Sequence, residues 1–120
     1  MSKYDGIFKR LRTIEGIIAD ANSFFGLELA IMTKSYCYDV SLEKFKKTLE
    51  KCGYKWYQDN FNAKDRVYTF PTTKSSIKFY FPEFTNVRGI YWDAVFFDEA
   101  ANIPIELMEQ VVISLKEKDD

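Results

Sequence analysis

The 120-residue sequence contains no histidine, only two cysteines, three prolines and five glycines. Without histidine, no Ser-His-Asp or Cys-His triad can form within the chain, and no zinc site can include an imidazole. Two cysteines, Cys37 and Cys52, give no disulfide framework, which favours reduced thiols. No apolar run approaches the ~18 residues of a membrane-spanning helix. The first residues, MSKYDGIFKRLR, lack the apolar centre of a signal peptide, so we expect a cytoplasmic location.

A further absence concerns phosphate binding. None of the five glycines precedes a lysine, so the sequence has no G-x-x-x-x-G-K-[ST] phosphate loop, the Walker A motif. That loop holds a triphosphate with backbone amides and a lysine. We therefore expect no cofactor and no independent ATPase activity; Mg²⁺ and ATP would bind only if a partner chain supplied the loop.

The residues that are present predict one domain spanning residues 1–120. The chain is 47% hydrophobic and 18% aromatic, which is enough for a core. Its net charge of −1 is uneven: residues 1–92 carry 15 basic and 10 acidic groups, and residues 93–120 carry 2 and 8. This predicts a solvated acidic C-terminal helix. A basic face that binds nucleic acid is the alternative, with Lys9, Arg10 and Arg12 as candidates.

Hydrophobic periodicity predicts an α/β fold, with α+β as the alternative. Helices are expected over residues 3–22, 42–51 and 104–115, with Ser41 capping the second and Gly53 ending it. Strands are expected over residues 27–33, 54–58, 66–70, 77–81 and 94–97. We predict a partial, P-loop-like three-layer sheet with an antiparallel insertion in its middle. Residues 94–97 should form a central strand, parallel to the strand at residues 27–33, because both segments are apolar on both faces.

The apolar run Ala94–Phe97 leads directly into Asp98 and Glu99. In open α/β sheets, ligands bind at the carboxyl ends of the strands. Asp98 could hold Mg²⁺ at a nucleotide's phosphates, and Glu99 could deprotonate a water, as in a Walker B motif. The alternative is a strand that merely ends at a solvated edge. We also expect Arg88 and Gly89 to form a tight turn that positions the loop before this strand.

Several phrases, in order, resemble the ATPase domain of viral terminase large subunits, which package DNA into phage heads. The resemblance covers residues 27–108 and comprises LELAIMT, SLEKFKKTLEKCGY, RVYTFPTTKSSIKFY, NVRG and YWDAVFFDEAANIP. The resemblance implies that Asp98 and Glu99 are Walker B residues. Because Walker A is missing, they would be vestigial, and Asp98 would be a weak candidate for binding Mg²⁺.

Three functions follow as hypotheses from this resemblance and its departures. The first is a small phage or mobile-element protein that binds a protein partner of the packaging machinery or a nucleic-acid enzyme. The second is an ATPase subunit that borrows a phosphate loop. The third is a phage-encoded, anti-CRISPR-like inhibitor of a host defence or repair enzyme. All three place the chain in the host cytoplasm.

Overall fold

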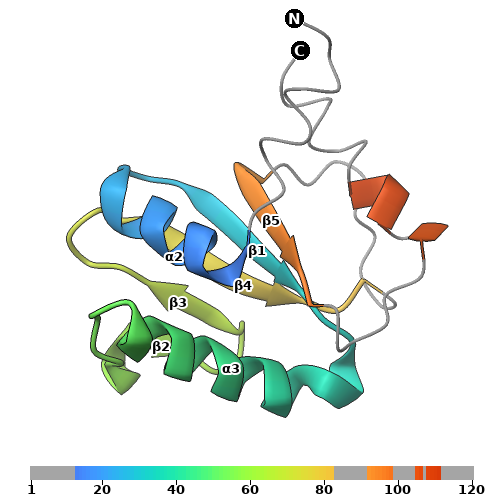
Figure 1. The fold of residues 1–120 in the computed structure, drawn as a ribbon, viewed down its shortest axis with the longest axis horizontal. Coiled ribbons are helices and arrows are strands. Elements are labelled where there is room, and N and C mark those ends of the chain that lie inside the picture. Colours follow the sequence, from blue (N-terminus) through green and yellow to red (C-terminus); the bar gives the residue numbers. More distant parts are fainter. Residues whose placement is uncertain (1–12, 83–91, 99–104, 107, 112–120) are drawn as a thin grey trace, which may run out of the picture.

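A computed structural model describes residues 13–82, 92–98, 105–106 and 108–111, shown as a ribbon in Figure 1. Its elements in chain order are α2 (Ile14–Ser23), β1 (Glu28–Met32), the 3-10 helix η1 (Ser35–Cys37), α3 (Tyr38–Lys51), the 3-10 helix η2 (Gln58–Asn60), β2 (Phe61–Asn62), β3 (Val67–Thr69), β4 (Ser76–Tyr80) and β5 (Ala94–Phe97). Residues 105–106 and 108–111 are helical. The predicted α/β class is confirmed.

The five strands form one mixed sheet with the order β2-β3-β4-β1-β5. β1 is parallel to both β4 and β5, whereas β3 is antiparallel to β4 and to β2. The predicted parallel pairing of β1 and β5 is therefore confirmed, and the two strands lie side by side in Figure 1. The predicted central position of β5 is wrong, because within the described sheet β5 is the last strand in the order.

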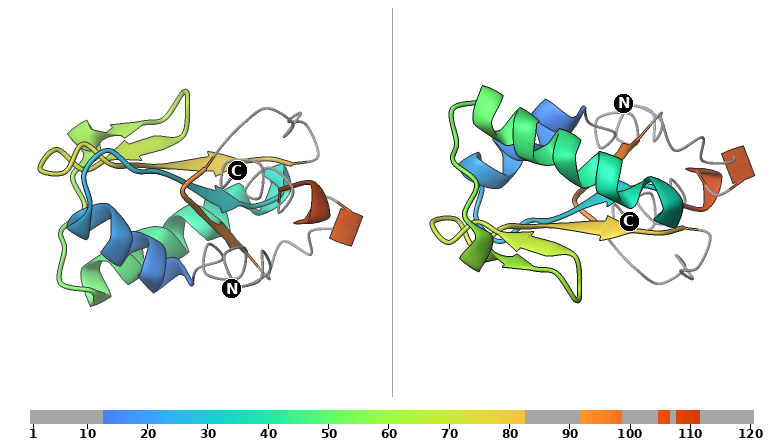
Figure 2. Two further views of the ribbon diagram at one scale, coloured as in Figure 1. Left: turned by 90° about the horizontal axis from the view of Figure 1, so that it is seen from above. Right: turned by 90° about the horizontal axis from the view of Figure 1, so that it is seen from below.

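Successive residues of β1 and β5 point to opposite faces of the sheet, and both faces are covered. Leu29 and Ile31 pack in a core with α2 and α3, and Ala30 and Met32 pack in a second core that contains Val111. Figure 2 shows α2 and α3 on the same side of the sheet. This double burial explains the continuous apolar character of the two strands, as parallel pairing requires.

Helix α3 begins earlier than predicted. The helix runs from Tyr38, so Ser41 lies inside it with a buried side chain and does not cap it. The apolar stripe of Leu42, Phe45 and Leu49 continues back to Tyr38, which packs on the same core. Tertiary packing of this extra turn thus outweighs the capping preference of serine.

Gly53 ends α3, as predicted, through a specific cap. Its φ is +92°, its N–H donates to the Glu50 carbonyl at 3.0 Å, and the Tyr54 N–H donates to the Leu49 carbonyl at 3.0 Å. These two bonds form a Schellman motif, which favours glycine at the left-handed position. The motif turns the chain into the segment 54–60 that follows α3.

Replacing Gly53 with alanine should lower the free energy of unfolding by about 1–2 kcal/mol, because a Cβ disfavours the left-handed conformation. Apart from the two adjacent residues, no atom lies within 4 Å of the added Cβ, so the cost is conformational and not a clash with another part of the fold. Urea denaturation measures the change. Gly53→Asn serves as the matched variant and should cost less, since asparagine tolerates this region. An alanine variant as stable as the wild type would contradict the assignment of this cap.

One further expectation is wrong. Residues 54–58 form no strand, because Trp56 packs its ring on the sheet and the chain then turns through η2. The Cys52 thiol is free and exposed. The predicted turn and basic patch stay predictions, because their residues lie outside the described part of the chain: Arg88 and Gly89 for the turn, and Lys9, Arg10 and Arg12 for the patch.

Within the described part of the chain, no helix is long and apolar enough to cross a membrane.

Candidate functional site

Asp98 lies at the carboxyl end of β5, where that strand runs beside the end of β1. The Asp98 N–H donates to the Met32 carbonyl at 3.0 Å, which extends the pairing of the two strands by one residue. The Asp98 side chain is only 2% exposed. A buried carboxylate requires polar partners to offset its desolvation. The structure supplies them from α3 and from the end of β1.

Two buried hydroxyls connect Asp98 to the end of β1. The Ser41 hydroxyl donates to Asp98 Oδ2, and Thr33 Oγ1 lies 2.8 Å from Ser41 Oγ. Either hydroxyl could be the donor between Thr33 and Ser41, and the Thr33 hydroxyl also lies 3.4 Å from the Lys34 carbonyl, to which it can donate. The contacts Thr33–Ser41–Asp98 therefore join three elements through hydrogen bonds, with all three side chains buried.

Lys44, one helical turn after Ser41, supplies the positive charge of this group. Its Nζ lies 3.9 Å from Asp98 Oδ1 and 5.3 Å from the centre of the Phe96 ring. The Lys44 side chain is 47% exposed, so its pairing with Asp98 is partly screened by solvent. Lys44 is thus a cation at the rim of the site, with its charge available to an anion arriving from solvent.

The donor set suits Mg²⁺ in the presence of a phosphate. One carboxylate and two hydroxyls are hard oxygen groups, and Mg²⁺ in nucleotide sites commonly takes one or two carboxylates, several waters and the substrate's phosphate oxygens. The described residues contain no group of three or more His, Cys, Asp or Glu side chains that could enclose a metal without a ligand. Asp98 would contribute the carboxylate, and Lys44 could contact a phosphate.

Of the predicted site residues, only Asp98 falls in the described part of the chain; Glu99, Arg88 and Gly89 lie outside it. Sequence reasoning missed Ser41 and Lys44 as its partners. Their spacing of three residues places both on one side of a helix, which was the available signal. Nothing in the sequence indicated that this side would face Asp98, which follows 57 positions after Ser41.

A family described as RNA cytidine acetyltransferase NAT10/TcmA, helicase domain, matches residues 18–117. The chain belongs to this family. Comparisons with curated proteins and with solved structures gave no significant match. The matched range includes every described element from the middle of α2 onward, and it includes Ser41, Lys44 and Asp98.

Membership of this helicase-domain family overturns the terminase assignment. It also removes the hypotheses of a DNA-packaging protein, a phage-encoded inhibitor and a phage ATPase subunit. The expected host-cytoplasm location rested on those hypotheses and has no support of its own. The physical reason is that the quoted phrases describe a buried strand, an acidic end and a following helix. Many α/β folds share that arrangement, so the phrases indicate architecture better than function.

Proposed function

We propose that this chain forms the acidic, metal-facing side of a nucleotide site in a helicase-type, RNA-remodelling ATPase domain. The observation that carries the proposal is the placement of Asp98 at the carboxyl end of β5, held by Ser41 and faced by Lys44, in a chain of the NAT10/TcmA helicase-domain family. Helicases couple nucleotide hydrolysis to nucleic-acid rearrangement. A metal-binding carboxylate at a strand end is a recurring part of such sites.

Each residue has a defined role in this proposal. Mg²⁺, when bound with a nucleotide, would neutralise the charge that develops on the phosphates. Asp98 would hold it, Ser41 and Thr33 would fix the orientation of the Asp98 carboxylate, and Lys44 would contact a phosphate oxygen. Glu99 stays the predicted general base. The sequence contains no phosphate loop to cradle a triphosphate, so these roles cover the metal-facing side alone.

The metal side can be tested without that cradle. Mn²⁺ binds oxygen ligands similar to those of Mg²⁺ and broadens nearby NMR signals. Titration of the 120-residue protein with Mn²⁺, in the presence of ADP, should broaden the amide signals of Thr33, Ser41 and Asp98 first. Asp98→Asn should weaken this effect at least about tenfold, since ligand loss in metal sites has at least the cost of a lost supporting residue.

Asp93→Asn is the matched control. Asp93 is at the amino end of β5, where its Oδ2 accepts a hydrogen bond from the Glu28 N–H at 2.8 Å. It is thus a carboxylate of the same strand, at the end where α/β sheets do not bind nucleotides. The broadening should survive in this variant. Equal broadening in the wild type and Asp98→Asn would exclude Asp98 as the metal ligand and overturn the proposal.

The partner predictions made from the sequence are not tested by the structure or the comparisons. A protein partner, and nucleic-acid contact through Lys9, Arg10 and Arg12, therefore stay predictions. The family supports RNA as the nucleic acid, because its description names an RNA-modifying enzyme.

A further inference from the structure

The segment after α3 holds an exposed tyrosine on a fixed backbone. The Trp56 ring stacks on Tyr68, with centroids 4.7 Å apart and an angle of 28° between the rings. The Tyr57 N–H donates to the Tyr68 hydroxyl at 3.2 Å. Tyr57 as a whole residue is 54% exposed. An aromatic ring whose backbone is already immobilised loses little entropy when a ligand binds to it.

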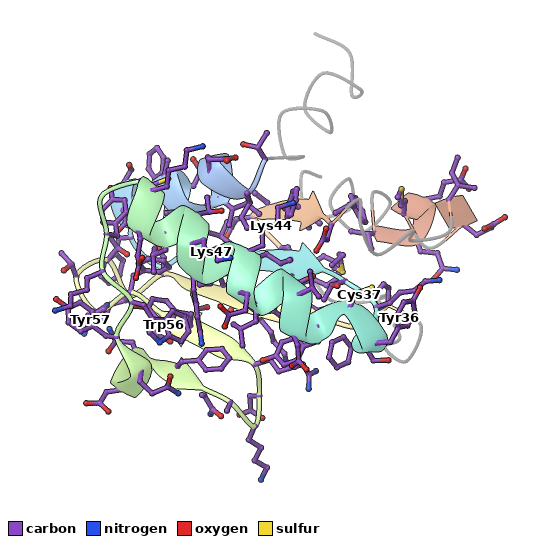
Figure 3. All side chains as sticks on the ribbon, turned by 60° about the horizontal axis from the view of Figure 1, so that its bottom comes forward. Tyr36, Cys37, Lys44, Lys47, Trp56 and Tyr57 are labelled. Atoms are coloured by element: carbon purple, nitrogen blue, oxygen red, sulfur yellow. The ribbon has the colours of Figure 1, made fainter. Side chains whose placement is uncertain are left out.

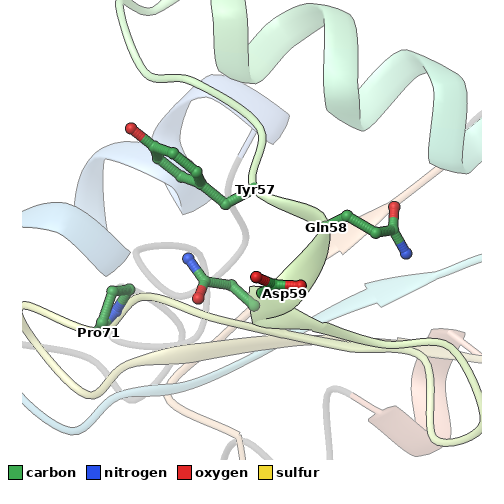
Figure 4. Close-up of a pocket in the computed structure, with 5 residues that line it drawn as sticks. Tyr57, Gln58, Asp59 and Pro71 are labelled. Atoms are coloured by element: carbon green, nitrogen blue, oxygen red, sulfur yellow. The ribbon is translucent and has the colours of Figure 1, made fainter.

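The Tyr57 ring borders two hollows of about 400 and 160 Å³, which share Tyr57, Asn60 and Pro71. The larger volume falls within the ~300–1,000 Å³ range of small-molecule sites. Figure 4 shows Tyr57 and Pro71 on opposite sides of the larger hollow, with Gln58 pointing away from it. Gln58 accepts a hydrogen bond from Trp56 Nε1 at 3.2 Å. The wall thus combines an exposed ring with polar groups of Asp59 and Asn60.

The segment that leads to this ring is rich in lysine, and Lys55 lies beside the ring, while the Asp59 carboxylate lines the larger hollow. Residues 44–57 contain five lysines and one acidic residue, Glu50, whereas the net charge of the chain is −1. Figure 3 shows Lys44 and Lys47 along α3, with Trp56 and Tyr57 beyond its carboxyl end and Tyr36 at the other end. Lys55 Nζ lies 6.0 Å from the centre of the Tyr57 ring. An anion attached to a group stacked on Tyr57 would therefore meet the Lys55 side chain, whereas Lys44 and Lys46 pair with Asp98 and Glu43.

We infer that this pocket binds a base of single-stranded RNA, with the base stacked on Tyr57 and an adjacent phosphate contacting Lys55. The combination of an exposed aromatic platform with flanking cations is the usual way in which proteins hold unpaired strands. The choice of RNA as the nucleic acid rests on the proposed function. The choice of the Tyr57 pocket as the binding site rests on the structure alone. The pocket is separate from the Asp98 site, because Asp98 is contacted by the amino-terminal half of α3 and Tyr57 follows its carboxyl end.

The test measures binding of a short, fluorescein-labelled oligocytidine by anisotropy; cytosine is chosen because its amino group can donate to a carboxylate such as Asp59. Tyr57→Ala should weaken binding about five- to a hundredfold, the range for loss of one stacked base, and Tyr57→Phe should restore it. Lys55→Gln should reduce the slope of log affinity against log salt by about 0.7, the value for one phosphate of a single strand.

Tyr36 and Lys34 provide matched controls. Tyr36 is 72% exposed, and Lys34 Nζ lies 5.8 Å from its ring centre, so the pair repeats the Tyr57–Lys55 arrangement at the other end of α3. Tyr36→Ala and Lys34→Gln should leave affinity and salt slope unchanged, because neither residue lines the hollows that Tyr57 borders. A second readout is the indole N–H signals of the two tryptophans: RNA should shift that of Trp56, which neighbours Tyr57, and not that of the buried Trp92.

Each contrary result has a distinct meaning. If the wild type binds RNA and Tyr57→Ala binds equally well, the pocket assignment is overturned and the proposed function stands. If the wild type binds no RNA, the pocket inference and the RNA part of the proposed function both fail, while the Mn²⁺ experiment still tests Asp98. A Trp56 shift caused by an unstructured acidic peptide, but not by RNA, would assign the pocket to a protein ligand and overturn the inference.

Discussion

Replacing Phe45 with alanine is expected to lower the free energy of unfolding by about 3–5 kcal/mol, the range for deleting a buried phenyl ring. Phe45 is fully buried, and its ring meets those of Trp56, Tyr68 and Phe79 edge-on at centroid distances of 5.7–6.1 Å. Loss of the ring removes the favourable free energy of burying it away from water and leaves a cavity. It also removes three aromatic contacts. Whole domains have a free energy of unfolding of only about 5–15 kcal/mol, so this substitution removes a large part of the stability of the protein.

Urea denaturation followed by circular dichroism measures this effect. Phe25→Ala is the matched control, because the Phe25 side chain is 77% exposed and its removal should change stability by less than about 0.5 kcal/mol. Phe45→Leu should fall between the two. A loss below about 1 kcal/mol in Phe45→Ala would show that the aromatic cluster does not hold α3 on the sheet. The cluster also positions Trp56, so the same variant should release the segment that carries Tyr57.

Much of the sheet could be predicted because burial on both faces leaves a local signature. Residues 29–32 of β1 and all of β5 are continuously apolar, and the prediction of their parallel pairing rested on that pattern. The position of β5 in the sheet could not be predicted in this way. An apolar pattern on both faces shows that a strand is covered above and below, but it does not show which strands pair with its two edges.

The failures at Ser41 and Trp56 share another cause. Serine before an apolar repeat favours a helix start, but packing of Tyr38 extended α3 by a turn. Aromatic residues favour strands, yet Trp56 stacks on Tyr68 from a segment without strand pairing. In both places, contacts between elements distant in the sequence outweighed local preference. Sequence patterns record the preference, and only the packed structure shows the contact.

Only part of the candidate site could be predicted from the sequence. Asp98 was identifiable because it directly follows a buried apolar strand, which places its carboxylate at the sheet edge where α/β proteins bind ligands. Ser41 and Lys44 were not, because they reach Asp98 only once α3 crosses the ends of β1 and β5. The family was missed for a related reason: the motifs describe a strand end that many nucleotide-binding folds share, and the features that distinguish those folds lie elsewhere.

The second large effect is expected at the bond between Ser41 and Asp98. Asp98→Ala should lower the free energy of unfolding by about 1.5–3 kcal/mol, the range for a hydrogen bond to a charged group, because Ser41 would stay buried without its carboxylate acceptor. Lys44 adds little to this figure, since its side chain is half exposed. Ser41→Ala should cost a similar amount, because it leaves a buried carboxylate without its hydroxyl donor.

A double-mutant cycle separates this bond from the general cost of altering two buried sites. If Ser41 and Asp98 act through one hydrogen bond, the Ser41→Ala, Asp98→Ala variant should lose about 1–2 kcal/mol less than the sum of the single variants. Thr48→Ser provides the comparison on α3, because the Thr48 hydroxyl donates to the Lys44 carbonyl within the helix; its effect should add to that of Asp98→Ala. Additivity of Ser41 and Asp98 within about 0.5 kcal/mol would show that the bond contributes no coupling. The coupling matters for function because α3 holds Asp98 near its start and leads into Tyr57 after its end, so the same helix links the two proposed sites.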